Sequence, residues 1–169
     1  MRQDILPCIG FGGGCHWCTE AVFQQLKGIK TVRQGFIRSD PPHEEWSEAV
    51  EVEFDPKVMC LHDLISVHLA THSSTSAHKM RGKYRSAIYI FTAEQSVEAK
   101  GIMQELSQEL DSAFVTMVLS HQGFKPSDER FQNYQSNDPS RPICKTYIDP
   151  KLAKLRMRFA GLLKNPDLH

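Results

Sequence analysis

The sequence predicts an α+β protein in which helices pack on a mixed or antiparallel β-sheet to form a two-layer sandwich. Short apolar or alternating runs that suit strands are interleaved with longer segments whose apolar residues recur every three or four positions. The predicted order is strand, helix, strand, strand, helix, strand, helix, strand, and then a loop and a final helix. Because no repeat, low-complexity tract or linker divides the 169 residues, we expect one domain over residues 1–169.

The first half of the chain begins with an apolar strand at 5–11, and a glycine-rich turn follows it. A second strand is expected at 31–37, and the proline-containing residues 38–45 read as a loop. Between the two strands the apolar residues repeat with helical spacing at Cys18, Ala21, Val22, Leu26 and Ile29.

Residues 46–54 alternate strictly and predict a strand with two different faces. Glu48 lies on the otherwise apolar face, whereas Glu51 and Glu53 lie on the opposite face and are expected to be solvated. A carboxyl group on an apolar face can hold a proton near neutral pH when no cation neutralises it. Alternatively, Glu48 lies in water at the frayed end of the strand, and the pattern does not decide between these two interpretations.

The second half predicts a helix around 61–68, a strand at 84–91, a helix at 93–110 and a strand at 113–119. Residues 72–80 and 120–148 are polar and irregular and are expected to be loops. Asp149 and Pro150 suit the start of the final helix, as an N-cap carboxylate and a proline at the first helical position. His68 and His72 have the spacing of helical metal ligands, but without a third ligand nearby we interpret them as a core and a helix-end histidine.

The charge balance argues against a nucleic acid or an anionic membrane as partner, because the chain has 20 basic and 20 acidic residues and its formal net charge is zero. No apolar run has the length of a membrane span, and the N-terminus has no apolar stretch of signal-peptide length. We therefore expect a soluble, cytoplasmic protein, and we expect it to be a monomer. Five cysteines without a secretion signal do not predict a disulfide scaffold.

The segment 10–20 joins the first strand to the first helix and holds three consecutive glycines before Cys15. Such a run lets the backbone turn sharply and lets a ligand approach main-chain atoms. Cys15 therefore lies at or just before a helix N-terminus, where free N–H groups and the helix dipole favour the thiolate. We interpret Cys15 as a reactive thiol rather than a small buried residue in a tight turn.

Cys15 and Cys18 have the spacing of a redox dithiol or of half a zinc site. No proline stands at the start of a predicted strand to serve as the cis-proline that faces the dithiol in thioredoxin-like folds. A zinc site needs a second close pair of ligands, but Cys8, Cys60 and Cys144 are isolated, so we expect no metal. Cys18 is expected in the core, and a general dithiol-disulfide oxidoreductase remains an alternative function.

Three motifs stand in a fixed order: Gly13-Gly14-Cys15-His16-Trp17-Cys18-x-Glu20, residues 47–56, and residues 82–89. Together they resemble the methionine sulfoxide reductases of the A type, whose first motif is commonly Gly-Cys-Phe-Trp. The resemblance runs over residues 8–147 and ends near Cys144, so that the helix after 149 lies outside it. It implies the ferredoxin-like core of that family.

The resemblance also implies an activity, the thiol-dependent reduction of methionine S-sulfoxide, free or in oxidised proteins. Cys15 would attack the sulfoxide sulfur, Glu48 would protonate its oxygen, and the hydroxyl group of Tyr84 would hydrogen-bond that oxygen. Trp17 would form one wall of the pocket for the substrate's methyl group. No metal or organic cofactor is implied.

The family's second step implies a disulfide. Cys15 becomes a sulfenic acid, which Cys144 would attack, and thioredoxin would then reduce the disulfide. Cys144 ends a polar segment, 140–144, that we expect to be mobile enough to reach Cys15. Cys18 is the alternative resolving thiol.

The chain departs from the family pattern at three positions. His16 follows the nucleophile where phenylalanine is usual, Phe36 stands where a tyrosine hydroxyl is usual, and Lys79 or a neighbour replaces an aspartate. We expect His16 and Phe36 to contact substrate together with Trp17. A redox sensor that kept the fold but lost turnover is a further alternative that these departures leave open.

Overall fold

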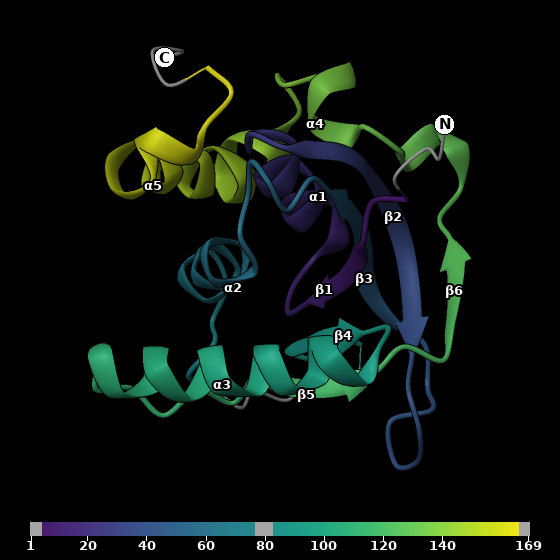
Figure 1. Ribbon diagram of the computed structural model, residues 1–169. Coiled ribbons are helices and arrows are strands. Elements are labelled where there is room, and N and C mark those ends of the chain that lie inside the picture. Colours follow the sequence, from purple (N-terminus) through teal and green to yellow (C-terminus); the bar gives the residue numbers. More distant parts are fainter. Residues whose placement is uncertain (1–4, 77–82, 166–169) are drawn as a thin grey trace.

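The computed structural model describes residues 5–76 and 83–165 (Figure 1). Its elements follow the predicted order as far as the fifth strand, after which it has a sixth strand and short helices that the sequence did not predict. Their bounds are β1 (Cys8–Gly12), α1 (His16–Gln24), β2 (Ile29–Arg38), β3 (Ser47–Phe54), α2 (Leu61–Ala70), β4 (Ala87–Ile90), α3 (Ala93–Glu109), β5 (Met117–Ser120), β6 (Gly123–Pro126), η1 (Glu129–Phe131), α4 (Tyr134–Asn137), η2 (Cys144–Ile148), α5 (Asp149–Arg158) and η3 (Ala160–Leu162).

The strands form one six-stranded sheet in the order β5-β4-β1-β3-β2-β6. The four central strands are all antiparallel and carry the ferredoxin-like arrangement, since β1, α1, β2, β3, α2 and β4 follow one another in the chain. The edge strand β5 pairs with β4 in parallel, and the long helix α3 makes the crossover that a parallel pair requires. The predicted mixed sheet is therefore confirmed.

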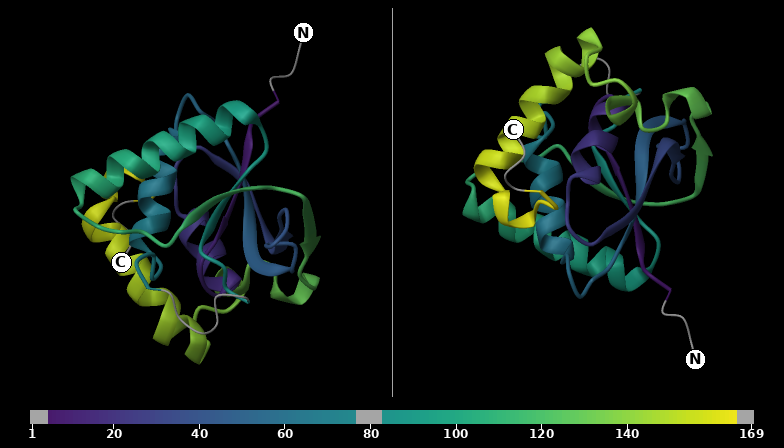
Figure 2. Two further views of the ribbon diagram at one scale, coloured as in Figure 1. Left: turned by 90° about the horizontal axis from the view of Figure 1, so that it is seen from below. Right: turned by 90° about the horizontal axis from the view of Figure 1, so that it is seen from above.

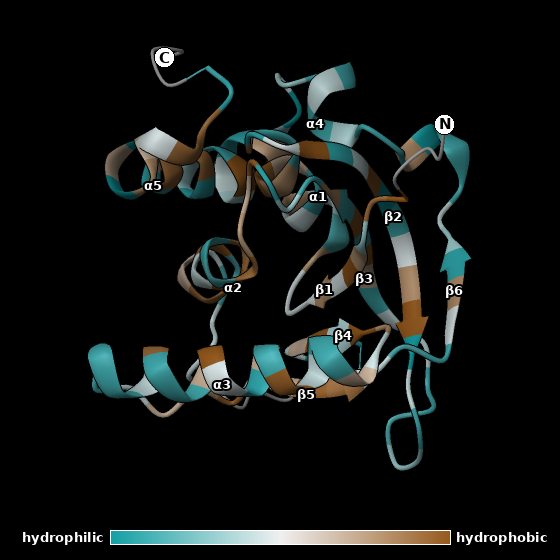
Figure 3. Ribbon diagram, viewed as in Figure 1, coloured by the Kyte–Doolittle hydropathy of each residue, from teal (hydrophilic) through white to brown (hydrophobic). Residues whose placement is uncertain are grey.

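Helices α1, α2, α3 and α5 gather on one face of the sheet, as two perpendicular views show (Figures 1 and 2). Buried apolar residues of these helices and of the strands form one core, and Figure 3 shows hydrophilic (teal) and hydrophobic (brown) stretches alternating along the helices. At the centre of this layer the rings of Phe11 on β1 and Phe23 on α1 stack with centroids 4.5 Å apart. The opposite face of the sheet carries a smaller apolar cluster, formed by Ile37, Ala49, Ala87 and Tyr89.

Two stretches differ from the sequence prediction. β4 begins at Ala87, so Tyr84 lies in the preceding loop rather than in the strand. Residues 120–148, expected to be irregular, contain β6, α4 and η2. β6 has no alternating pattern because it is an edge strand paired only with β2, where Pro126 is tolerated. Lys79, which was expected at or near the position of the family's aspartate, lies outside the described residues.

The expectation that Glu51 is solvated is wrong. Its side chain is buried, with Oε1 3.1 Å from Nε of Arg33 and Oε2 2.7 Å from Nε2 of His121. Burial acts to raise the pKa of Glu51, but the contacts with His121 and Arg33 outweigh it and lower that pKa. The strand is covered on both faces because His121, which follows β5, reaches back over the sheet.

Glu20 on α1 is buried and holds the chain around α4 against the sheet. Its Oε1 accepts hydrogen bonds from Nε2 of Gln34 at 3.0 Å and from the Tyr134 N–H at 3.1 Å, and its Oε2 accepts from the Asn133 N–H at 2.9 Å. Burial raises the pKa of Glu20, against the lowering effect of these three donors. One carboxyl group thus joins α1, β2 and α4 at three points.

Replacing this acceptor should destabilise the protein. We expect Glu20→Gln to lower the free energy of unfolding by about 1–3 kcal/mol, because an amide N–H₂ would face a backbone N–H donor that loses its partner. Urea denaturation followed by circular dichroism measures the effect. Glu98→Gln is the matched control on an exposed helix position, where a change within about 0.5 kcal/mol is expected. Equal midpoints for the two variants would contradict the anchoring role of Glu20.

Candidate active site

Cys15 lies at the N-cap position of α1, where the glycine run predicts it. The chain leaves β1 at Gly12 and passes through Gly13, where a Cβ atom would come within 2.4 Å of the His72 ring. Only glycine therefore fits at this turn. The carbonyl oxygen of Cys15 accepts the first helical hydrogen bonds from the N–H groups of Cys18 and Thr19, at 3.1 and 3.2 Å.

The pKa of the Cys15 thiol is lowered, and the Cys18 thiol is the largest cause because it donates a hydrogen bond to the Cys15 sulfur. Burial opposes this shift, the backbone N–H groups of Trp17 and Cys18 add to it, and the nearby charge of Glu48 opposes it. The same contact raises the pKa of Cys18 well above its ordinary value, helped by burial. One thiol is thus prepared as a thiolate, and its neighbour keeps its proton.

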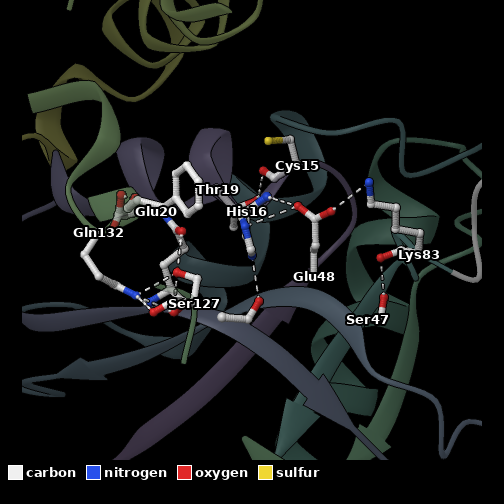
Figure 4. Close-up of polar contacts among 12 residues, drawn as sticks. Cys15, His16, Thr19, Glu20, Ser47, Glu48, Lys83, Ser127 and Gln132 are labelled. Atoms are coloured by element: carbon white, nitrogen blue, oxygen red, sulfur yellow. Dashed lines mark hydrogen bonds and ion pairs between the residues drawn. The ribbon is translucent and has the colours of Figure 1, made fainter. Parts of the chain in front are cut away.

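Glu48 lies on β3 beside the first turn of α1, and its carboxyl group stands between His16 and Lys83 (Figure 4). Its Oε1 accepts the backbone N–H of His16 at 3.2 Å and lies 3.4 Å from Nε2 of the same residue. Its Oε2 lies 3.6 Å from the Lys83 ammonium group. Glu48 is 6% exposed, so it does not lie in water at a frayed end, but a cation does approach it from the solvent side.

Aromatic rings line α1 next to this carboxyl group. The Trp17 ring stacks on Tyr134 with centroids 4.1 Å apart and lies 5.5 Å from the ring of Phe131. The His16 ring meets the edge of Phe36 at 5.2 Å. An apolar wall of this kind suits a small apolar group such as a methyl group.

Tyr84 is half-buried, and the Lys83 ammonium group lies 5.0 Å from the centroid of its ring. A hydrogen bond with Tyr84 and the charge of Glu48 raise the pKa of Lys83. Lys83 therefore connects Tyr84 to the carboxyl group of Glu48.

Cys144 does not lie in an irregular segment as the sequence predicted. It is fully buried at the start of η2, a π-helix continuous with α5, and its Sγ donates to the Asp138 carbonyl oxygen at 3.6 Å. η2 packs against α1, and Cys144 contributes to the raised pKa of Cys18. Cys18 is buried as expected, and it interacts with both of the other thiols, Cys15 and Cys144.

A small cavity beside the two α1 cysteines is also lined by Lys151 of α5 and by His68 and His72. The Lys151 ammonium group donates to the Thr71 carbonyl oxygen. His68 is buried with Nε2 2.9 Å from the Gly12 carbonyl oxygen, as a core histidine would be. Within residues 5–76 and 83–165, His, Cys, Asp and Glu side chains form no cluster that could hold a metal ion.

Comparison with known proteins identifies the family. Residues 8–162 match the family model described as peptide methionine sulfoxide reductase. The chain is 34% identical to the peptide methionine sulfoxide reductase MsrA of Deinococcus radiodurans, over 91% of this chain and 82% of that protein. It is 34% identical to the MsrA of Chromobacterium violaceum, over 98% of this chain and 100% of that protein. The chain belongs to the peptide methionine sulfoxide reductase family.

Solved structures share the fold. Mxr1 of Saccharomyces cerevisiae in its reduced form matches with a TM-score of 0.70 at 20% identity, over 86% of this chain and 94% of that one. Methionine sulfoxide reductase A of Corynebacterium diphtheriae matches with a TM-score of 0.67 at 21% identity, over 81% and 77%. The family match extends to residue 162, so the helix from Asp149 lies inside the family pattern and the expected end near Cys144 is wrong.

Within this reductase family member the structure brings together most of the residues that the sequence singled out. Cys15, His16, Trp17 and Cys18 share α1, and Glu48 meets them from β3. Glu20 and Lys83 belong to the motifs that carry the family resemblance, but their roles, like that of Lys151, were not predicted because their partners lie far away in the chain. For Glu20, the position between the apolar residues Cys18 and Ala21 on α1 was the available signal.

The contact between the two α1 thiols predicts how the reactivity of Cys15 depends on Cys18. Because the Cys18 donor favours the thiolate, Cys18→Ala should raise the pKa of Cys15 toward the free-thiol value of about 8.5. Cys18→Ser keeps a hydroxyl donor and should preserve most of the shift. Iodoacetamide alkylation followed by mass spectrometry, as a function of pH, resolves Cys15 from the other thiols. Identical profiles for Cys18→Ala and the unaltered protein would refute the hydrogen-bond argument.

Proposed function

We propose that this protein reduces methionine S-sulfoxide, in oxidised proteins or as the free amino acid, with an external thiol as reductant. The observation that carries the proposal is the meeting of Cys15 and Glu48 at the start of α1. Cys15, whose thiol has a lowered pKa, directly precedes His16, and the backbone N–H of His16 donates to the buried carboxyl group of Glu48. A nucleophile beside a proton donor is what attack on a sulfoxide requires.

The first step consumes one proton. The Cys15 thiolate attacks the sulfoxide sulfur to form a transient sulfur–sulfur bond, and Glu48 gives its proton to the sulfoxide oxygen. That oxygen then passes to the Cys15 sulfur as the sulfur–oxygen bond of the substrate and the transient sulfur–sulfur bond break. The products are methionine and Cys15 sulfenic acid, so the substrate sulfur is reduced by two electrons and the cysteine sulfur is oxidised by two. This step uses neither a metal nor an organic cofactor.

The residues around Cys15 and Glu48 can contact the methyl group and the sulfoxide oxygen of the substrate. Trp17, held by stacking on Tyr134, would pack against the methyl group, and Phe36 would extend this apolar wall. Tyr84 would hydrogen-bond the sulfoxide oxygen from the loop before β4. Phe36 brings no hydroxyl group to that oxygen, so more of its stabilisation falls to Glu48 and Tyr84.

The contacts of the three thiols favour Cys18 as the first to attack the sulfenic acid. Cys18 already donates to the Cys15 sulfur, whereas Cys144 is buried in η2 and interacts with Cys18. Attack by Cys18 forms a Cys15–Cys18 disulfide and releases water. Attack of Cys144 on Cys18 would then return the Cys15 thiolate and leave a Cys18–Cys144 disulfide. This order keeps Cys144 as the final resolving thiol but makes Cys18 the intermediate.

Thioredoxin is the proposed reductant. One solved relative of the same fold, Mxr1, is described in complex with Trx2, with a TM-score of 0.62 and 20% identity. It aligns with 79% of this chain and 89% of its own.

The proposed acid is tested by Glu48→Gln, which keeps the shape but removes the proton. We expect the single-turnover rate of methionine sulfoxide reduction to fall by about 10²–10⁴-fold, with weaker effects on substrate binding. Racemic methionine sulfoxide with dithiothreitol is the substrate, and only the S-epimer should disappear. Cys15→Ser should abolish the reaction. A rate within a few-fold of the unaltered protein across pH would remove Glu48 from this role.

The same assay separates the alternative functions. A general dithiol-disulfide oxidoreductase would reduce insulin disulfides instead of methionine sulfoxide, and a redox sensor would be inert toward both.

The order of thiol reactions is tested by peptide mapping after one equivalent of substrate. Cys144→Ser should accumulate a Cys15–Cys18 disulfide and cycle slowly with thioredoxin, since the final disulfide cannot form. Cys18→Ser should stall at the sulfenic acid or form a Cys15–Cys144 bond only slowly. Normal cycling of Cys18→Ser, with a Cys15–Cys144 bond as its main product, would instead make Cys144 the direct resolving thiol.

A further inference from the structure

His16 occupies the position after the nucleophile, and its imidazole ring is buried against the proposed acid. The residue is 5% exposed, with Nδ1 2.7 Å from the Gly35 carbonyl oxygen and Nε2 3.4 Å from Oε1 of Glu48. Figure 4 shows the ring between the β2 backbone and the Glu48 carboxyl group. Each ring nitrogen thus faces an oxygen atom.

The two contacts fix where protons can lie. A carbonyl oxygen only accepts, so Nδ1 carries the hydrogen that it donates to Gly35. In the neutral ring Nε2 then has a lone pair, and Oε1 of Glu48 lies 3.4 Å from this nitrogen. A lone pair facing an ionised carboxylate is repulsive in a buried site, whereas a proton on either atom makes the contact attractive.

Within the part of the chain that the structure describes, no other charged group next to the pair lies close to both Nε2 and Oε1 and could offset their repulsion in place of this proton. Lys83 reaches Oε2 of Glu48 from the surface, and its side chain is 56% exposed, so water screens its charge. The backbone N–H of His16 donates to Oε1, and the Cys15 thiol lies on the next residue. The ring of Phe36 packs against the His16 ring with centroids 5.2 Å apart. Burial, followed by Lys83, lowers the pKa of His16, while Gly35 and Glu48 act to raise it.

We propose that His16 and Glu48 together carry a single proton, on Nε2 or on Oε1, and that His16 is a positioning residue that keeps this proton available to the sulfoxide oxygen. The inference deepens the proposed function and rests on it for its catalytic part. The proton moves from the pair to the substrate oxygen during attack by Cys15, and the pair is then proton-free. It takes up the next proton from solvent on the Lys83 side before another turnover.

Because the two groups share one proton, they should titrate as a unit. The test is NMR with ¹⁵N-histidine and ¹³C-carboxyl glutamate in a Cys15→Ser background, where no thiolate titration contributes. We expect the signals of His16 Nε2 and the Glu48 carboxyl group to change together at one pH, while Nδ1 stays protonated. Glu48→Gln should shift the His16 transition to lower pH by about one unit or more, since the carboxylate that favours the imidazolium ion is gone.

Lys83→Gln is the matched control, because it also alters a charge next to Glu48. Its effect on the His16 transition should be small and in the opposite direction, toward higher pH, since an exposed cation is removed. Separate transitions of His16 and Glu48, or a His16 transition that Glu48→Gln leaves unchanged, would overturn the shared proton.

The catalytic part is tested with His16→Gln, whose amide can donate to Oε1 but cannot store a proton. The alkaline limit of the single-turnover rate should move to lower pH, giving a loss of about tenfold or more on that limb. An unchanged limit would show that His16 does not supply the proton. If the unaltered protein reduces no methionine sulfoxide, the proposed function fails, but the NMR titration still decides whether the proton is shared.

Discussion

The hydrogen bond from the His16 backbone N–H to the Glu48 carboxyl group is the interaction on which the site depends. It ties the first turn of α1 to the start of β3, two elements separated by 32 positions in the chain. The N-terminus of a helix has N–H groups without helical partners, and a buried carboxyl group needs donors, so each satisfies the other. Cys15 and the acid are held next to each other as a result.

The glycines before Cys15 make this arrangement possible. The turn from β1 to α1 passes so close to His72 that a side chain at Gly13 would clash with its ring. His72 is in turn held by Ser86, whose hydroxyl group lies 2.8 Å from its Nε2. The position of the nucleophile therefore depends on contacts with α2 and the start of β4, and the ferredoxin-like core is what brings these elements together.

Charge is distributed unequally around the two reacting groups. Cys15 receives three donors, from one thiol and two backbone N–H groups, whereas Glu48 adds a negative charge that opposes the thiolate. A proton on the His16–Glu48 pair would reduce this opposition at the moment when the thiolate is needed. The buried carboxylates Glu20 and Glu51, by contrast, are fully supplied with donors or cations and serve to join elements.

Features that depend on local pattern could be predicted from the sequence. Periodicity predicted the order of strands and helices of the ferredoxin-like core, and the glycine run predicted Cys15 at a helix N-terminus, because both follow from residues near one another in the chain. Only the tertiary structure decided which side chains meet across elements. Glu51 is buried because His121 reaches it from beyond β5, and Cys144 is buried because η2 packs on α1. His16 faces Glu48 because β3 lies beside the start of α1, and no spacing within the chain encodes such a contact.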